Sequence, residues 1–201
     1  MRHINKNQAP PKFSESVKRK LPKQWEELHQ QDKDIYREAC EALLEEQNNM
    51  CGYTEIYFRD NVKRHIDHYI KRDIDNRKTF DWNNLIYATR DSEFGACHKD
   101  KVIKKVDYMD IFNPITDYPE EYFEYSYLGE IHPKSDIDAS NHAKAEKTIQ
   151  MFNLNHKSLC LKRQNITIAI ESLRKGKMAK EEIIEHLRDG GFDSLKKQIL
   201  V

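Results

Sequence analysis

Residues 65–71 read HIDHYIK, in which two histidines surround a single aspartate. The surrounding run from Arg64 to Tyr69 is strand-like and predicts a short β-strand. On such a strand His65 shares a face with Asp67, whereas His68 points to the opposite face. An aspartate followed by a histidine is common by chance, so its meaning depends on the residues further along the chain.

Two further candidate residues, an asparagine and a histidine, follow the Asp67-His68 pair along the chain. Asn84 comes sixteen residues after His68, next to an apolar run, and His98 comes fourteen residues later, within Cys97-His98-Lys99-Asp100-Lys101. The pattern around them predicts a hairpin, a loop and then a helix. The histidine, asparagine and histidine are thus expected on three successive elements of one compact unit.

Composition limits the classes of function. The chain has 201 residues, of which 38% are hydrophobic and 34% charged, and its formal net charge is zero. One domain with extensions is therefore expected, without the whole-body basic field that draws proteins to nucleic acid. Any nucleic-acid binding must come from a local patch or from a partner.

Hydropathy and cysteine spacing indicate a reducing cellular compartment. No stretch is long and apolar enough to span a membrane, and the N-terminus lacks the apolar segment of a secretory signal. The four cysteines lie far apart, without a CxxC pair. These features predict a cytoplasmic protein with reduced thiols.

The remaining chain is divided by its patterning. Residues 1–23, which are basic and contain prolines, are expected to form an extended arm, and residues 23–47 an amphipathic helix. Residues 52–58 are expected to be strand-like, and residues 107–133 irregular with a hairpin over 122–131. Helices are expected again from Ala139, and a last one over 179–189 ends at Gly190-Gly191.

The ordered set Asp67-His68, Asn84-Leu85 and Cys97-His98-x-x-Lys101 resembles the HNH, or ββα-metal, endonuclease family. The resemblance implies an α+β fold with a ββα-metal core and helical N-terminal and C-terminal extensions. It implies that His68 is the general base, and that Asp67 and His98 bind Mg²⁺ or Mn²⁺. Asn84 would fix the loop and orient the His68 ring.

Other residues are expected to contact the substrate. Imidazole suits proton transfer near neutral pH, and a divalent cation stabilises the charge of a phosphodiester under attack. Lys101 is expected to assist catalysis, although Lys99 could replace it as the lysine that faces phosphate. The side chains expected to bind nucleic acid are those of His65, Lys71, Arg72 and Lys99.

No structural zinc is expected. HNH proteins often hold zinc with two CxxC knuckles, but Thr54 stands where the first pair would have its second cysteine, and only Cys97 lies near the second pair. Four ligands are needed for a tetrahedral zinc site. Cys51 and Cys97 are therefore expected to be buried as small apolar side chains.

Further pieces narrow the resemblance to the HNH proteins of Septu-type and retron-associated anti-phage systems. They include the N-terminal Met1-Arg2-His3-Ile4-Asn5-Lys6, the run Gln47 to Glu55 and Phe80-Asp81-Trp82-Asn83-Asn84-Leu85. This resemblance implies control by an ABC-type, SMC-like ATPase of the same operon. It also allows a retron reverse transcriptase with its msDNA as a partner.

The sequence thus predicts three segments. The expected division is an arm and scaffold helix over 1–49, the nuclease core over 50–110, and an irregular and then helical extension over 111–201. The favoured function is a metal-dependent endonuclease acting on DNA or RNA in anti-phage defence. The alternatives are a catalytically idle HNH-like scaffold and a stand-alone restriction-type nuclease.

Overall fold

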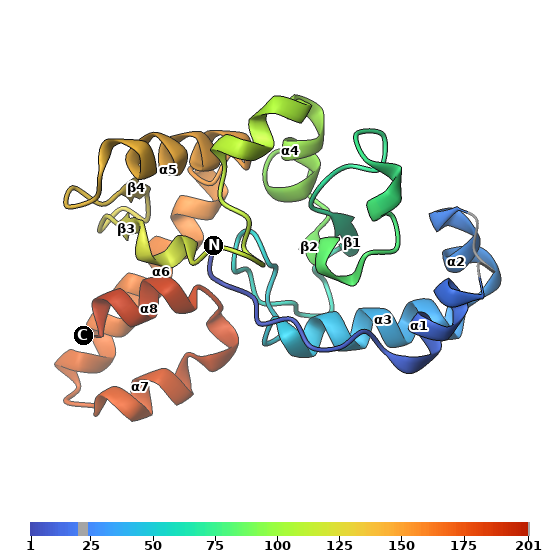
Figure 1. Cartoon of the computed structure of the whole chain (residues 1–201). Coiled ribbons are helices and arrows are strands. Elements are labelled where there is room, and N and C mark those ends of the chain that lie inside the picture. The colour runs from blue at the N-terminus through green and yellow to red at the C-terminus, as the bar shows by residue number, and fades with distance from the viewer. Residues whose placement is uncertain (20–23, 201) are drawn as a thin grey trace.

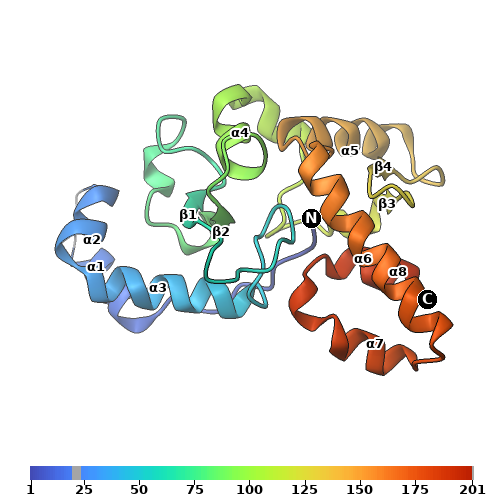
Figure 2. The same cartoon turned by 180° about the vertical axis from the view of Figure 1, so that it is seen from behind.

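The computed structural model describes residues 1–19 and 24–200, apart from the side chains of His29 and Gln31. In this part of the chain, helices are combined with two separate two-stranded antiparallel sheets (Figure 1), which is compatible with an α+β fold. The N-terminal helices lie at one end of the molecule and the C-terminal helices at the other (Figure 2).

The first sheet is a hairpin. Strand β1 (Arg64–His68) pairs with β2 (Leu85–Thr89), with Asp67 opposite Ile86 and His68 opposite Leu85. All five residues of β2 are buried, because α3 (Lys33–Glu46) and α4 (Gly95–Val102) both contact this strand. A strand covered on both sides reads as a continuous apolar run, as LIYAT does.

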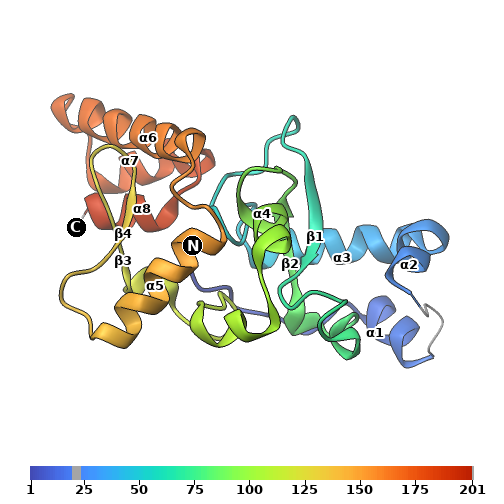
Figure 3. The ribbon, with the colours of Figure 1, turned by 90° about the horizontal axis from the view of Figure 1, so that it is seen from above.

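The N-terminal third contains three helices. Helix α1 spans Pro11–Lys18, α2 spans Trp25–Gln31, and α3 follows directly after Asp32. The expected single helix over 23–47 is therefore two helices, with residue 23 outside the described part of the chain. Figure 3 shows α2 at the far end from α6 and α7.

The expectation of an extended, unpacked arm over residues 1–23 is wrong for the described residues 1–19. Residues 11–18 form α1, and Met1, Ile4 and Phe13 are buried in the main hydrophobic core. Pro11 occupies the first position of this helix, where its missing N–H costs no hydrogen bond. Residues 20–23 of that arm lie outside the described residues.

The C-terminal part begins with the second hairpin, β3 (Phe123–Tyr125) with β4 (Ile131–Pro133), close to the expected position. Its turn has Gly129 at a φ of +80°, where an added Cβ would lie 2.2 Å from the Cys160 carbonyl oxygen. The helices that follow are α5 (Ala139–Met151), α6 (Lys157–Lys175), α7 (Lys180–His186) and α8 (Asp193–Ile199). Short 3₁₀ turns cover Asn76–Lys78, Trp82–Asn84, Lys105–Asp110, Pro119–Glu121 and Arg188–Gly190.

The expected strand over 52–58 is a turn. Glu55 has a φ of +60° and is buried, and its carboxylate accepts hydrogen bonds from the Met1 amine at 2.8 Å and from Ser194 N at 2.9 Å. Its carbonyl also accepts from Phe192 N at 2.9 Å. This segment therefore joins the N-terminus to α8 rather than extending a sheet.

One main core connects these parts. It includes buried side chains from the N-terminal segment, from both hairpins and from α8, among them Ile4, Leu28, Ile66, Leu85, Phe112, Phe123, Phe152 and Leu195. Among the helices of the described residues, none combines the length and apolar character needed to cross a bilayer.

Candidate active site

His68 ends strand β1 and its ring is held in one orientation. Its Nε2 lies 2.9 Å from the Thr79 carbonyl oxygen, which can only accept a hydrogen bond. Nε2 therefore carries the proton of the neutral ring, and Nδ1 is the unprotonated nitrogen. No described residue forms a hydrogen bond with Nδ1. The Trp25 ring packs edge-on against the imidazole, with 4.7 Å between the centroids.

Burial keeps the His68 imidazole neutral. Desolvation is the largest influence and lowers the pKa of His68 from 6.5 to about 4, against the smaller opposing effects of the Thr79 carbonyl and of Asp67. Near pH 7 the ring is therefore almost wholly in the form that can accept a proton. The same burial lowers the pKa of His65, whose buried Nδ1 has no hydrogen-bond partner among the described residues.

A cavity of about 460 Å³ opens beside these side chains. Five residues singled out from the sequence line it, namely His65, Asp67, His68, Lys71 and Arg72, together with Trp25, Ile66, Asp73 and Asp100. They come from β1, from the chain that leaves β1, from α2 and from α4. The fold thus brings the two histidines, the aspartate and two of the expected phosphate-binding cations to one place.

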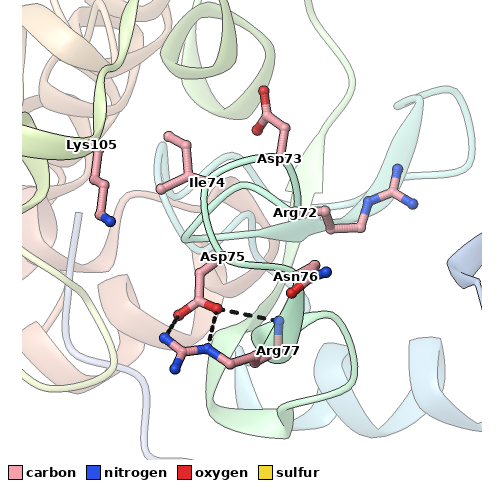
Figure 4. Close-up of a pocket in the computed structure, with 7 residues that line it drawn as sticks. All are labelled: Arg72, Asp73, Ile74, Asp75, Asn76, Arg77 and Lys105. Carbon is pink, nitrogen blue, oxygen red and sulfur yellow. Dashed lines mark hydrogen bonds and ion pairs between the residues drawn. The ribbon is translucent and has the colours of Figure 1, made fainter.

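A second cavity, of about 500 Å³, shares Arg72 and Asp73 with the first. In Figure 4 the Asp75 carboxylate makes two contacts with the Arg77 guanidinium. Lys105 lies on the side of the cavity opposite Arg72. Arg72 points away from that pair and bonds Glu26 of α2 at 2.7 Å. The two cavities are therefore neighbours, and cationic side chains line both of them.

Asn84 joins the two ends of the chain that separates β1 from β2. Its Oδ1 accepts from Ile70 N at 2.8 Å, and its Nδ2 donates to the carbonyls of Ile70 at 3.0 Å and Lys78 at 3.1 Å. Thr79, which follows Lys78, supplies the carbonyl that holds the His68 ring. Asn84 therefore fixes the segment that orients His68, without touching His68 itself.

Asp67 is buried, and one of its two carboxylate oxygens has two hydrogen-bond partners. Its Oδ2 accepts from the Tyr53 hydroxyl at 2.5 Å and from the Lys99 ammonium at 2.8 Å. Lys99 is completely buried. Burial acts to lower its pKa, but Asp67 and Asp100 outweigh this effect, so the pKa of Lys99 lies above the ordinary value. In this structure Lys99 is closed off from any phosphate at the surface.

His98 and Lys101 lie away from the cavity wall. His98 Nδ1 is 3.0 Å from the Met151 carbonyl oxygen, and the exposed Lys101 donates to the Ser92 carbonyl at 2.7 Å. Helix α4 directs these two side chains toward α5 and toward its own preceding loop. Neither the expected second metal ligand nor the expected catalytic lysine is therefore among the residues that line the cavity beside His68.

Asp67 and His98 are the two residues that the resemblance assigns to a Mg²⁺ or Mn²⁺ ion, and only Asp67 lines the cavity beside His68. Asp67 Oδ2 has two hydrogen-bond partners, whereas the contact of His98 Nδ1 with the Met151 carbonyl leaves Nε2 as the unprotonated nitrogen, the form in which imidazole binds a metal. Within residues 1–19 and 24–200, no group of three or more His, Cys, Asp or Glu side chains is arranged to hold a metal ion. The buried Cys51 accepts a hydrogen bond from Thr89 N at 3.3 Å.

Sequence reasoning missed four residues of this site. The helical pattern around Trp25 predicts a core-facing side chain, yet this residue also forms a wall of the cavity. Tyr53, Thr79 and Asp100 carry no motif, and only their contacts with Asp67, His68 and Lys99 reveal them. Neither a protein-family model nor a curated protein matches the chain.

Proposed function

We propose that this protein is an endonuclease of the HNH type that hydrolyses phosphodiester bonds, with His68 as its general base. The observation that carries the proposal is the Nε2 contact of His68 with the Thr79 carbonyl. It leaves Nδ1 as the only ring nitrogen able to take a proton, in a cavity with cationic side chains. The finer fold assignment is also proposed here, because β1, β2 and α4 follow the order of a ββα-metal core.

The proposed reaction uses water as the nucleophile. His68 Nδ1 takes a proton from the water as its oxygen bonds phosphorus, the bond from phosphorus to the leaving oxygen breaks, and solvent protonates that oxygen. Lys71 and Arg72 bind the phosphate oxygens. Arg72 now pairs with Glu26 at 2.7 Å in an exposed ion pair that costs little to exchange. Lys71 is half-buried, and its ammonium lies 3.5 Å from Asp73 and donates to the Asp100 carbonyl at 2.9 Å. No step is assigned to a metal ion.

Two histidine variants test this function and separate it from an idle scaffold. His68→Ala should lose about 10²–10⁴-fold in cleavage rate, since a general base contributes that much. His65 lines the same cavity, and His65→Ala should be much milder. The assay measures cleavage of DNA and RNA, single-stranded and double-stranded, by the purified protein. Equal activity of His68→Ala and the wild-type protein would exclude the proposed base.

Control by an ABC-type, SMC-like ATPase in phage defence, with or without a retron reverse transcriptase, remains a proposal that rests on the resemblance. One surface supports a docking role, because Val106 is 72% exposed and Met109 83% exposed on the Lys105–Asp110 turn. Lys105 of this turn lines the second cavity, so a partner bound there would lie beside that cavity.

A further inference from the structure

The Lys99 ammonium lies within a shell of four oxygen atoms. Its Nζ is 2.8 Å from Asp67 Oδ2, 2.9 Å from the His68 carbonyl, 3.0 Å from the Tyr69 carbonyl and 3.2 Å from Asp100 Oδ1. The rings of Tyr53 and Tyr69 lie 5.6 and 5.9 Å from it. Two carboxylates and two carbonyls around one point form the environment of a hard cation.

This shell holds more acceptors than a lysine can satisfy. An ammonium has three hydrogens, and Lys99 directs them to Asp67 and to the carbonyls of His68 and Tyr69. The fourth oxygen, Asp100 Oδ1, is buried without a hydrogen bond among the described residues, although it is within ion-pair distance. A buried carboxylate oxygen without a donor is costly, whereas a spherical ion would serve all four oxygens.

We propose that Lys99 is the resident cation of this site and occupies a position that would otherwise bind a divalent metal ion such as Ca²⁺. This assignment predicts that removal of the Lys99 side chain creates a metal site from Asp67, Asp100 and the two carbonyls. The four distances from the Lys99 Nζ to oxygen atoms support its place as the cation of this site.

The ammonium has a second effect on the site. It donates to the backbone carbonyls of His68, which is the proposed base, and of Tyr69, the next residue. It also neutralises the charge of the Asp67 carboxylate beneath the cavity. An anionic phosphate therefore meets less repulsion there. This electrostatic role rests on the proposed nuclease function, so the test of occupancy is designed without any measurement of cleavage.

The test uses Tb³⁺, a luminescent substitute for Ca²⁺ that nearby tyrosines sensitise. Wild-type protein should show no luminescence that depends on Asp100, whereas Lys99→Ala should bind one Tb³⁺ per chain, and Ca²⁺ should displace it. The double variant Lys99→Ala/Asp100→Asn should lose this gained signal. Lys101→Ala removes an exposed lysine two positions along the same helix and should behave as wild type.

Thermal unfolding provides a second measurement if the Lys99→Ala variant is only weakly folded. Lys99→Ala should unfold at lower temperature than wild type, and Ca²⁺ at about 100 times its Kd should raise Tm by roughly 5–10 °C in this variant only. Three results would overturn the proposal. They are a wild-type Tb³⁺ signal that Asp100→Asn abolishes, a folded Lys99→Ala without added binding, and a Lys99→Ala chain that stays unfolded in excess Ca²⁺.

Discussion

Trp25 packs edge-on against His68, with 4.7 Å between ring centroids and 82° between ring planes. Helix α2 therefore covers part of the imidazole, although the two residues are far apart in the chain. Burial is the main cause of the low pKa of His68. The Trp25 indole is one of the groups that keep water from this ring.

Replacement of Trp25 by alanine should therefore change the acid–base behaviour of His68. We expect Trp25→Ala to raise the pKa of His68 from about 4 toward 6.5, because water regains access to the ring. Titration of the imidazole proton resonances by NMR measures this. Trp82→Phe alters the other tryptophan, which does not line the cavity, and should leave the pKa of His68 unchanged. An unaltered titration in Trp25→Ala would show that other groups desolvate the ring.

The buried His68 should also make stability depend on pH. Its pKa is 6.5 as the reference value and about 4 in the folded chain, so between these values the unfolded state binds more protons. Stability contributed by the neutral ring is thus complete above pH 6.5 and falls as the pH decreases toward 4. The loss should reach about 3 kcal/mol. Urea unfolding between pH 4 and 6.5 measures the free energy of unfolding, which should depend less on pH in His68→Gln than in the wild-type protein. His132→Gln changes an exposed residue of β4 and should keep the wild-type dependence.

Asn84 and its neighbour Asn83 form a matched pair. Asn84→Ala removes three hydrogen bonds between its amide and the backbone and should cost about 2–3 kcal/mol of folding free energy. Asn83→Ala changes an exposed side chain and should stay within about 0.5 kcal/mol. Denaturant unfolding gives both values. Hydrogen exchange should further show faster opening near Ile70 in Asn84→Ala alone. Similar losses in both variants would contradict the linking role of Asn84.

Arg72 is expected to contact one phosphate of the substrate. Arg72→Ala should weaken nucleic-acid binding with little regard to sequence, and should reduce the slope of log K against log salt by about 1. Fluorescence anisotropy at several salt concentrations measures the slope. Arg37→Ala removes an exposed arginine of α3 that pairs with Asp34 outside the cavity, and it serves as the control. Equal slopes for the two variants would place the substrate elsewhere.

The partner is best tested on the Lys105–Asp110 turn. Deletion of residues 1–23 would remove Met1, Ile4 and Phe13 from the core and should unfold the protein, so it cannot report on docking. Val106→Asp with Met109→Asp should keep Tm, because both side chains are exposed, while association with a co-expressed ATPase falls. Leu128→Asp, exposed on the second hairpin, is the control. Unchanged co-purification of the double variant would place the partner on another surface.

The strand that contains His68 and the helix that contains His98 were predictable because their signals are local. Residues 64–69 form a strand-like run, but the expected strand over 52–58 is a turn, and β1 pairs instead with the apolar run of β2. The turn around Glu55 was not predictable in this way. Its carboxylate is buried against Met1 and Ser194, which lie 54 and 139 positions away in the sequence.

The same limit applies to the candidate site. The sequence indicated His65, Asp67 and His68 as one group, and the structure has them on one cavity. It gave no sign that Lys99 is buried, because the reason is the Asp67 carboxylate 32 positions earlier. The direction of His98 depends on Met151, which is 53 positions later. Spacing in the sequence can suggest which residues act together. It does not show which of these side chains bond residues of a distant element instead of facing the site.

The single amide of Asn84 closes the excursion from Ile70 to Lys78 at its base. Residues between these two anchors can therefore change in length and composition while the position of His68 is kept, since doubling the length of a flexible loop costs only about 0.6 kcal/mol. Arg72 and Arg77 both lie on this excursion. Residues 73–77 could thus be exchanged by grafting to alter target preference, while Lys71, Arg72 and the two anchors are kept.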